Sequence, residues 1–148
     1  MSQLSVSDFA DRLIDIMQVI GREFLRHETQ EFYKMKITLP QFIVMDFLNR
    51  SGQTRMTDAA RFLRVTTAAM TGIADRMVRD GYITRISDPQ DRRIIKLKLT
   101  AKGDKIVKTA VEHRKRSIIK LFGMVSQKER DDYLNILGHI HSHLKEGA

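Results

Sequence analysis

The sequence predicts a mainly α-helical fold with one small β-hairpin, and two observations carry this prediction. First, residues 66–79 place apolar side chains at helical spacing on one stripe, namely Met70, Ile73, Ala74, Met77 and Val78. Second, residues 95–99 (IKLKL) alternate strictly, which is typical of a half-buried strand with a basic outer face. A charged turn at residues 87–93 separates this strand from residues 82–86, so the two segments are expected to pair as a hairpin.

Both ends of the helix at residues 66–79 carry recognisable signals. Thr66 or Thr67 can cap its N-terminus. Gly81 stands where a left-handed residue commonly ends a helix. The face opposite the apolar stripe begins with small residues, among them Ala68. A small-faced helix followed directly by a hairpin is the arrangement of a winged helix-turn-helix, whose recognition helix reads DNA.

A long first helix is predicted from about Ser7 to about His27, where apolar residues keep a spacing of three or four. Ser5 followed by Asp8 resembles a capping signal, and residues 28–37 are expected to end the helix loosely. The apolar stripe consists of Phe9, Leu13, Ile16, Met17, Ile20 and Phe24. Either the same small domain or a second copy of the chain could cover this stripe.

Two shorter helices are predicted before the recognition helix. The first begins with a capping box formed by Thr38 and Gln41, and it ends at Gly52. Residues 55–65 (RMTDAARFLRV) predict the second, with Thr57 as its N-cap. Only two residues at the end of this segment, Arg64 and Val65, lead to the recognition helix at Thr66, so the two helices must cross steeply, as in a helix-turn-helix.

Two amphipathic helices follow the hairpin. The first runs from Thr100 to about Val125, and the second begins with a capping box formed by Ser126 and Glu129. No repeat and no linker rich in glycine and serine interrupts the chain. We therefore expect a single unit over residues 1–148.

The composition narrows the function classes. The chain has no cysteine, which excludes disulfides, thiol redox switches and thiolate metal sites. No apolar run approaches the roughly 20 residues that span a bilayer, and the N-terminus lacks the basic segment of a signal peptide. We expect a cytoplasmic protein with no membrane partner. No nucleophile motif, glycine-rich phosphate loop or HExxH motif occurs, so neither an enzyme nor a cofactor is expected.

The net charge of +8 is unevenly distributed along the chain. Residues 1–31 carry a net charge of −3, residues 32–99 carry +7 and residues 100–148 carry +4. The positive charge is therefore concentrated on the predicted winged region, as neutralisation of DNA phosphates requires. A solvated basic surface would give the same pattern.

Four stretches resemble the MarR family of transcription regulators: residues 39–48 (LPQFIVMDFL), 56–65, 75–85 (DRMVRDGYITR) and 88–103 with its DPQDRR and LKLTAKG strings. The last stretch is the most specific for the family. The resemblance implies a homodimer in which residues 1–31 and 104–148 are dimerisation helices and residues 38–100 form the winged helix-turn-helix. It further implies a palindromic double-stranded DNA site, repression as the expected mode, and control by a small molecule.

The recognition helix enters the major groove through its N-terminal half, which presents Thr66, Thr67, Ala68 and Thr71. These positions lack Arg, Lys, Asn and Gln, so bidentate contacts to guanine or adenine are not available from the helix front. What remains is hydroxyl hydrogen bonding and contact with thymine methyl groups. One of the two leading threonines is expected simply to cap the helix.

The wing is expected to supply the strongest DNA contacts. Arg92 and Arg93 are placed to reach the adjacent minor groove, although a solvated turn is the alternative. Asp91 is implied by the family resemblance to hold the neighbouring arginine. Arg76 is expected to meet a phosphate or an acidic neighbour. The predicted DNA-binding set is Thr66, Thr67, Ala68, Thr71, Arg76, Asp91, Arg92, Arg93 and Lys96.

The resemblance also implies a ligand cleft where the dimerisation helices meet the winged region. It would be lined by Phe24, His27, Phe42 and His113, and aromatic walls with polar groups suit a small aromatic or phenolic acid. A cleft that is simply packed is the alternative. His27 and His113 could also approach each other. His139, His141 and His143 point to different helix faces, so no metal site is expected from them.

Two functions remain open at this stage. One is a sequence-specific, ligand-responsive transcription regulator. The other is an architectural DNA-binding protein of low sequence selectivity, which the absence of Arg, Lys, Asn and Gln from the front of the recognition helix leaves open.

Overall fold

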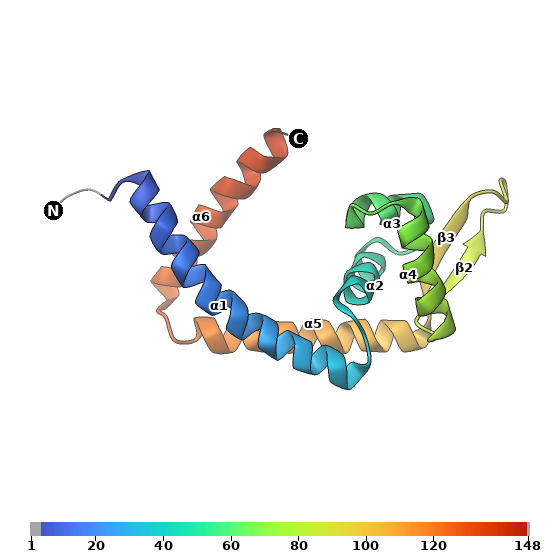
Figure 1. Ribbon diagram of the computed structural model, residues 1–148, viewed down its shortest axis with the longest axis horizontal. Coiled ribbons are helices and arrows are strands. Elements are labelled where there is room, and N and C mark those ends of the chain that lie inside the picture. Colours follow the sequence, from blue (N-terminus) through green and yellow to red (C-terminus); the bar gives the residue numbers. More distant parts are fainter. Residues whose placement is uncertain (1–3, 148) are drawn as a thin grey trace. The chain divides into compact units, whose positions relative to one another are not determined.

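A computed structural model of the chain describes residues 4–147. Its elements, in chain order, are α1 (Val6–Met35), α2 (Leu39–Ser51), β1 (Thr54–Arg55), α3 (Met56–Leu63), α4 (Thr67–Arg79), β2 (Ile83–Ser87), β3 (Ile95–Leu99), α5 (Ala101–Phe122) and α6 (Gln127–Glu146). The chain divides into two compact units, one up to His113 and one from Arg114. The predicted fold class, mainly helical with a small β wing, is confirmed (Figure 1).

Helix α1 is about two turns longer than predicted, because it runs through Met35 and ends at the left-handed Lys36 (φ 56°). The expected loose end at residues 28–37 is therefore wrong. The reason is tertiary: Phe32 is buried, and its ring lies 5.1 Å from the ring of Phe42 in α2, measured between centroids. Packing on α2 thus stabilises two turns whose sequence alone is a poor amphipathic helix.

The predicted N-caps of α1, α2 and α6 are confirmed. In each case a hydroxyl oxygen accepts a hydrogen bond from the backbone N–H three residues on, and the capping residues are Ser5, Thr38 and Ser126. The cap predicted for α3 is wrong, because α3 follows Arg55 directly and Thr57 lies inside the helix. Arg55 belongs to strand β1, so pairing in the sheet sets the start of α3 without a side-chain cap.

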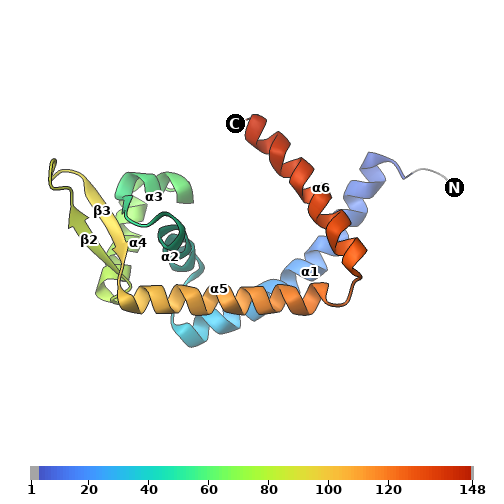
Figure 2. The ribbon, with the colours of Figure 1, turned by 180° about the vertical axis from the view of Figure 1, so that it is seen from behind.

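The β structure is a three-stranded antiparallel sheet in the order β1-β3-β2. Strands β2 and β3 pair from Ile83 with Leu99 to Ser87 with Ile95, which confirms the predicted hairpin. Strand β1 was not predicted, because two residues are too short to show alternation. Seen from two sides, the β2–β3 hairpin projects beyond α3 and α4 (Figures 1 and 2).

The core of the first unit lies between α2, α4, the hairpin and the start of α5. Its largest fully buried side chains are Phe42, Met45, Leu48, Met70, Met77, Ile83, Leu97, Val44 and Val107. Helix α5 approaches the hairpin very closely at Gly103, where an added Cβ would lie 2.0 Å from the carbonyl oxygen of Tyr82. The Thr100 hydroxyl accepts a hydrogen bond from the Gly103 N–H at 3.0 Å, which caps the helix at this approach.

The two outer helices expose their apolar stripes. In α1, the side chains of Phe9, Leu13, Ile16, Met17 and Ile20 are 44–56% exposed. Helix α6 has no buried residue, although the rings of Phe122 and Tyr133 stack at its start, 5.4 Å apart. None of the helices in residues 4–147 combines the length and the hydrophobicity that crossing a lipid bilayer needs.

Candidate nucleic-acid interface

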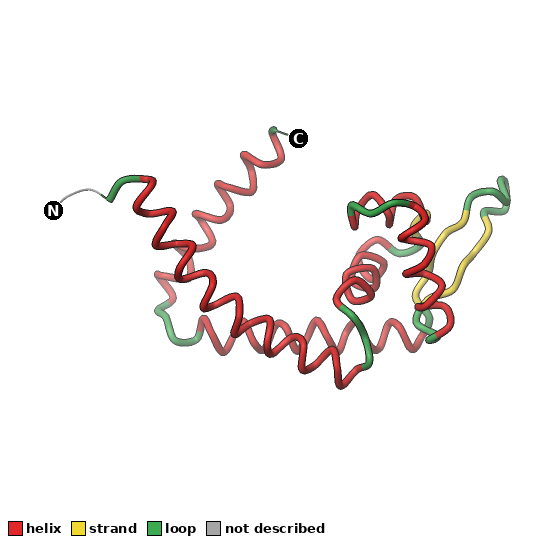
Figure 3. Tube along the Cα trace, in the orientation of Figure 1, coloured by secondary structure: helices red, strands yellow, loops and turns green. Residues whose placement is uncertain are grey.

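The turn between α3 and α4 is short, as the tube in Figure 3 shows, and backbone hydrogen bonds close it. Arg64 adopts the left-handed conformation (φ 55°), and the Val65 N–H donates to the Ala60 carbonyl at 3.0 Å. Thr66 then caps α4, since its hydroxyl oxygen accepts from the Ala69 N–H at 3.1 Å. Ala60 is buried, as expected for a small residue between closely packed helices. These contacts build the predicted helix-turn-helix.

Packing of its inner stripe decides which face α4 presents. Met70, Ala74 and Met77 are completely buried, so the opposite face must point outward. That outer face carries Thr67, Ala68 and Thr71, all of them exposed. The Thr71 hydroxyl donates its proton to the Thr67 carbonyl at 2.9 Å, so towards solvent it offers an acceptor oxygen and a methyl group.

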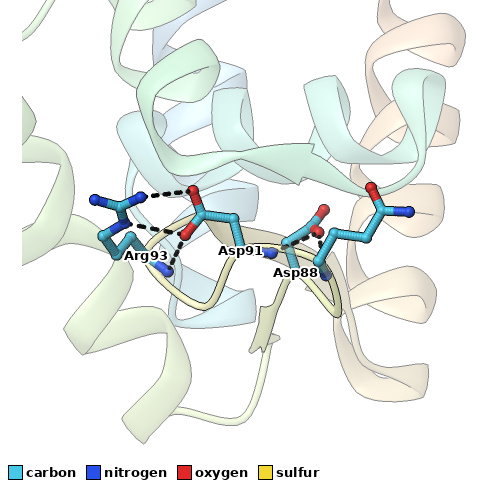
Figure 4. Close-up of polar contacts among 4 residues, drawn as sticks. Asp88, Asp91 and Arg93 are labelled. Atoms are coloured by element: carbon cyan, nitrogen blue, oxygen red, sulfur yellow. Dashed lines mark hydrogen bonds and ion pairs between the residues drawn. The ribbon is translucent and has the colours of Figure 1, made fainter.

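The wing turn is organised by two aspartates, which Figure 4 shows with Arg93. Asp91 holds Arg93 in two ways. Its carboxylate accepts from the Arg93 guanidinium at 3.2 Å (Nε) and 3.5 Å (Nη2), and from the Arg93 backbone N–H at 3.0 Å. The Arg93 side chain is nevertheless 92% exposed, so a cation that Asp91 orients stands on the surface of the wing.

Asp88 is a wing residue that the sequence did not single out. One of its oxygens accepts from the backbone N–H of Gln90 at 2.9 Å and of Asp91 at 3.3 Å, and the other pairs with Lys96 Nζ at 3.0 Å. The hydrogen bond from Lys96 and these backbone bonds hold the pKa of Asp88 below its ordinary value. Lys96, predicted to bind DNA, is thus already bound to a carboxylate and only partly exposed.

Arg76 and Arg92, two further predicted cations, are both exposed. The neighbouring Arg79 forms an ion pair with Asp80, with 3.4 Å between Nε and Oδ1. Within residues 4–147, Arg92 makes no ion pair, in contrast to Arg93. The two wing arginines therefore differ in how firmly they are oriented.

A groove of about 450 Å³ separates α4 from the wing. It is lined by Met56, Thr57, Thr67, Thr71, Asp75, Arg85, Arg93, Ile94 and Ile95. An ion pair between Asp75 of α4 and Arg85 of β2 lies on its edge, and neither residue was predicted to belong to the site. Asp75 follows Thr71 by four residues on the helix, so its position on the same face was open to prediction.

Comparison with known proteins agrees with this arrangement. Residues 37–95 match the model of the MarR family. The transcriptional repressor MdtR of Bacillus subtilis is 29% identical over 124 residues, covering 84% of this chain and 77% of MdtR. The winged region of the chain is therefore a MarR family domain. MarR family proteins are transcription regulators that bind DNA.

Solved structures show the same MarR fold. A MarR family protein from Bacillus stearothermophilus has a TM-score of 0.84 and 20% identity, with 95% of this chain and 99% of that chain covered. A mutant of S. aureus MepR bound to an oligodeoxyribonucleotide has a TM-score of 0.68 and 22% identity, with 89% and 97% covered. The α-helical fold with its β wing is therefore that of MarR proteins.

The four residues predicted for a MarR-type ligand cleft lie in different settings. Phe24 is half-buried on α1, whereas Phe42 is almost fully buried in the core. His27 Nε2 lies 3.2 Å from a carboxylate oxygen of Glu23. His113 Nδ1 lies 3.8 Å from Glu31, and its Nε2 is buried without a hydrogen-bond partner among the described residues.

A small groove lies beside these residues, at the junction of α1 and α2. It has a volume of about 290 Å³ and is lined by Leu25, Thr29, Phe32, Tyr33, Ile37, Thr38 and Leu39. None of the four predicted cleft residues is among them, although Phe32 contacts Phe42. Among residues 4–147, no three His, Asp or Glu side chains gather in a way that could hold a metal ion.

Proposed function

We propose that this MarR family protein is a homodimeric repressor that binds a palindromic site in double-stranded DNA. The observation that carries the proposal is that one groove joins the threonine face of α4 to Arg93 of the wing, which hydrogen-bonds to Asp91. A helix face and a basic wing on the same side of a protein suit simultaneous contact with adjacent grooves of DNA. A regulator acts where DNA is present, so we also propose a cytoplasmic location.

The recognition helix would contact the major groove through Thr66, Thr67, Ala68 and Thr71, and the wing would reach the minor groove through Arg92 and Arg93. Asp91 would act by orienting Arg93, as its three hydrogen bonds support. Arg76 would meet a phosphate. Lys96 would contribute charge to the base of the wing beside its Asp88 partner. With few donors on the helix front, specificity would depend strongly on the wing and on DNA shape.

The homodimer is supported by the exposed apolar stripes of α1 and α6. A single chain leaves these side chains in water, and burying them would contribute about 25 cal/mol for each Å² of apolar surface. In such a dimer, residues 1–31 and 104–148 would form the interface and residues 38–100 the DNA-binding region. A two-fold axis between protomers is what matches a palindromic site.

The test is a binding assay on the DNA upstream of the gene, followed by a base-substitution scan of the protected site. A sequence-specific repressor should lose about 1–3 kcal/mol of binding free energy for each wrong base pair at contacted positions. Equal affinity for every duplex in the scan would instead favour the alternative function, an architectural DNA-binding protein of low sequence selectivity. Measurements at two salt concentrations separate the phosphate contribution, which falls as counterions compete.

Control by a small aromatic acid is the remaining part of the proposal. The groove between α1 and α2 supports it, because apolar walls from Leu25 and Phe32 stand beside the exposed Tyr33. A ligand that altered how the two recognition helices are separated would affect DNA binding, since they must lie about 34 Å apart, one DNA turn.

Calorimetric titration of phenolic acids into free and DNA-bound protein tests this control. A ligand that lowers DNA affinity must bind the free protein more tightly than the complex, by the same factor. We expect such a difference for at least one acid of the series. Equal affinity for both forms, or no binding at millimolar ligand, would contradict it. The DNA-binding part of the proposal would stand in that case.

A further inference from the structure

The ion pair between Asp75 and Arg85 is an unusual feature for a surface that meets DNA. The two residues lie ten positions apart and join the recognition helix to strand β2. The Asp75 side chain is 59% exposed and that of Arg85 is 34% exposed. An exposed pair of this kind contributes little to folding stability, so stability alone does not account for it.

Its position places Asp75 on the surface that the proposed function assigns to DNA. Asp75 lines the same groove as Thr67 and Thr71, and all three residues lie on α4. With a rise of 1.5 Å per residue, Asp75 lies about 12 Å along the helix axis from Thr67. A recognition helix that lies along the major groove can present residues about two turns apart to base edges.

Electrostatics limits what a carboxylate can do at this position. DNA phosphates repel an uncompensated negative charge, which lowers affinity for every sequence equally. Arg85 neutralises Asp75 in place, and it leaves the exposed carboxylate as a hydrogen-bond acceptor. Because Thr71 donates its own proton to the helix backbone, the groove-lining side chains of Thr71 and Asp75 both offer acceptors.

We propose that Asp75 is a specificity-determining residue that accepts a hydrogen bond from the N4 amino group of a cytosine in the major groove. Arg85 is its positioning residue, holding the carboxylate in the groove and cancelling its charge. This inference rests on the proposed DNA-binding function and adds a base preference to it.

The chemistry of base edges favours cytosine over adenine. Both bases present an amino group in the major groove, but adenine also presents the N7 acceptor beside it. A carboxylate aimed at adenine would face that acceptor, whereas a carboxylate aimed at the cytosine amino group does not. Guanine and thymine offer acceptors at their edges, so a carboxylate is unfavourable against either base.

The experiment is selection from a library of random-sequence duplexes, with sequencing of the bound fraction. The full-length wild type is compared with Asp75→Asn, Arg85→Ala and Arg85→Lys. The matched control is Asp104→Asn, which removes one negative charge from an exposed ion pair with Lys108 on α5, outside this groove. Thermal melting of each variant checks that it is folded.

The wild type should select a site with one cytosine per half-site that Asp75→Asn no longer prefers, with about a tenfold loss of discrimination at that position alone. Asparagine suits adenine, so the preference should shift towards A·T there. Arg85→Ala should lose the same cytosine preference and Arg85→Lys should retain part of it, while Asp104→Asn leaves the whole profile unchanged.

Two results would overturn the inference. One is an Asp75→Asn profile identical to that of the wild type at every position. The other is a uniform change of affinity that Asp104→Asn reproduces, since this would reveal a general effect of charge. A wild type that selects no sequence at all would overturn the sequence-specific function itself, and this base preference with it. That outcome is visible before any variant is measured.

Discussion

Arg92 and Arg93 are adjacent residues of equal charge, yet the structure supports them differently. Asp91 fixes the guanidinium of Arg93 through Nε and Nη2. Arg92 has no ion pair within residues 4–147. A guanidinium that already has a hydrogen-bond partner to orient it loses less conformational freedom when it binds, so Arg93 is the better prepared of the two for insertion into a narrow minor groove.

We predict that Arg93→Ala weakens DNA binding at least tenfold, and that Arg92→Ala also weakens it but by less. Neither side chain packs in the core, so the free energy of unfolding should change by less than about 0.5 kcal/mol. Fluorescence anisotropy with labelled duplexes measures the affinity, and Lys128→Ala on α6 is the control for loss of one exposed charge. Unchanged binding by both variants would remove the wing from the mechanism.

Repeating that assay with duplexes of different sequence distinguishes phosphate contacts of the arginine from insertion into the minor groove. Loss of affinity on every duplex alike would indicate phosphate contacts by the arginine. Loss confined to duplexes with A·T-rich flanks would indicate insertion into a narrow minor groove, where the negative potential is strongest.

Among the elements, the junction of the hairpin and α5 leaves no room for a side chain at Gly103. The Thr100 N–H donates to the Tyr82 carbonyl at 3.0 Å, and α5 begins at once beside that same carbonyl. Gly103 makes the approach possible because it has no Cβ. The wing is thereby held to the helix that follows it, at the opposite end from the tip that would touch DNA.

We predict that Gly103→Ala destabilises the protein by about 1–3 kcal/mol, because the new methyl group would collide with a backbone carbonyl. The control is Gly72→Ala in α4, where an added Cβ meets nothing within 4 Å. That control should raise stability by about 0.5–1 kcal/mol, since alanine is the better helix former. Chemical denaturation measures both changes, and equal stability of the two variants would contradict the predicted collision.

For the whole molecule, the feature that indicates association with another chain is the apolar surface that one chain leaves in contact with water. Helix α1 exposes large apolar side chains along most of its length, from Val6 to Leu25. Helix α6 continues this character with Leu134, Ile136 and Leu144. Exposed apolar patches of this extent mark protein–protein contact sites.

We predict that the protein is an obligate homodimer, and that Leu13→Glu in the α1 stripe dissociates or unfolds it. Burying a new carboxylate in an apolar interface carries a large desolvation cost. Gln18→Glu, on the opposite face of the same helix, is the matched control and should remain dimeric. Light scattering at micromolar concentration reports the mass, and a stable folded wild-type monomer would end this prediction.

The sequence alone determined the features that depend on residues close together in the chain. Helical spacing predicted α4 and α5, alternation predicted β3, and hydroxyl residues such as Thr38 and Ser126 predicted helix starts. Periodicity and capping are set within one or two turns, so a local pattern is enough to specify them. The same locality located the recognition helix and the wing arginines.

The tertiary structure alone decided what depends on partners far apart in the chain. Packing of Phe32 on Phe42 extended α1, and pairing with β3 created strand β1. The ion pair of Asp75 with Arg85 requires a helix and a strand to be folded against each other. No spacing rule specifies such encounters, because they arise only when the core has placed both elements. Asp75 could therefore be recognised as a candidate base-contacting residue only from the fold, although the residue itself is present in the sequence.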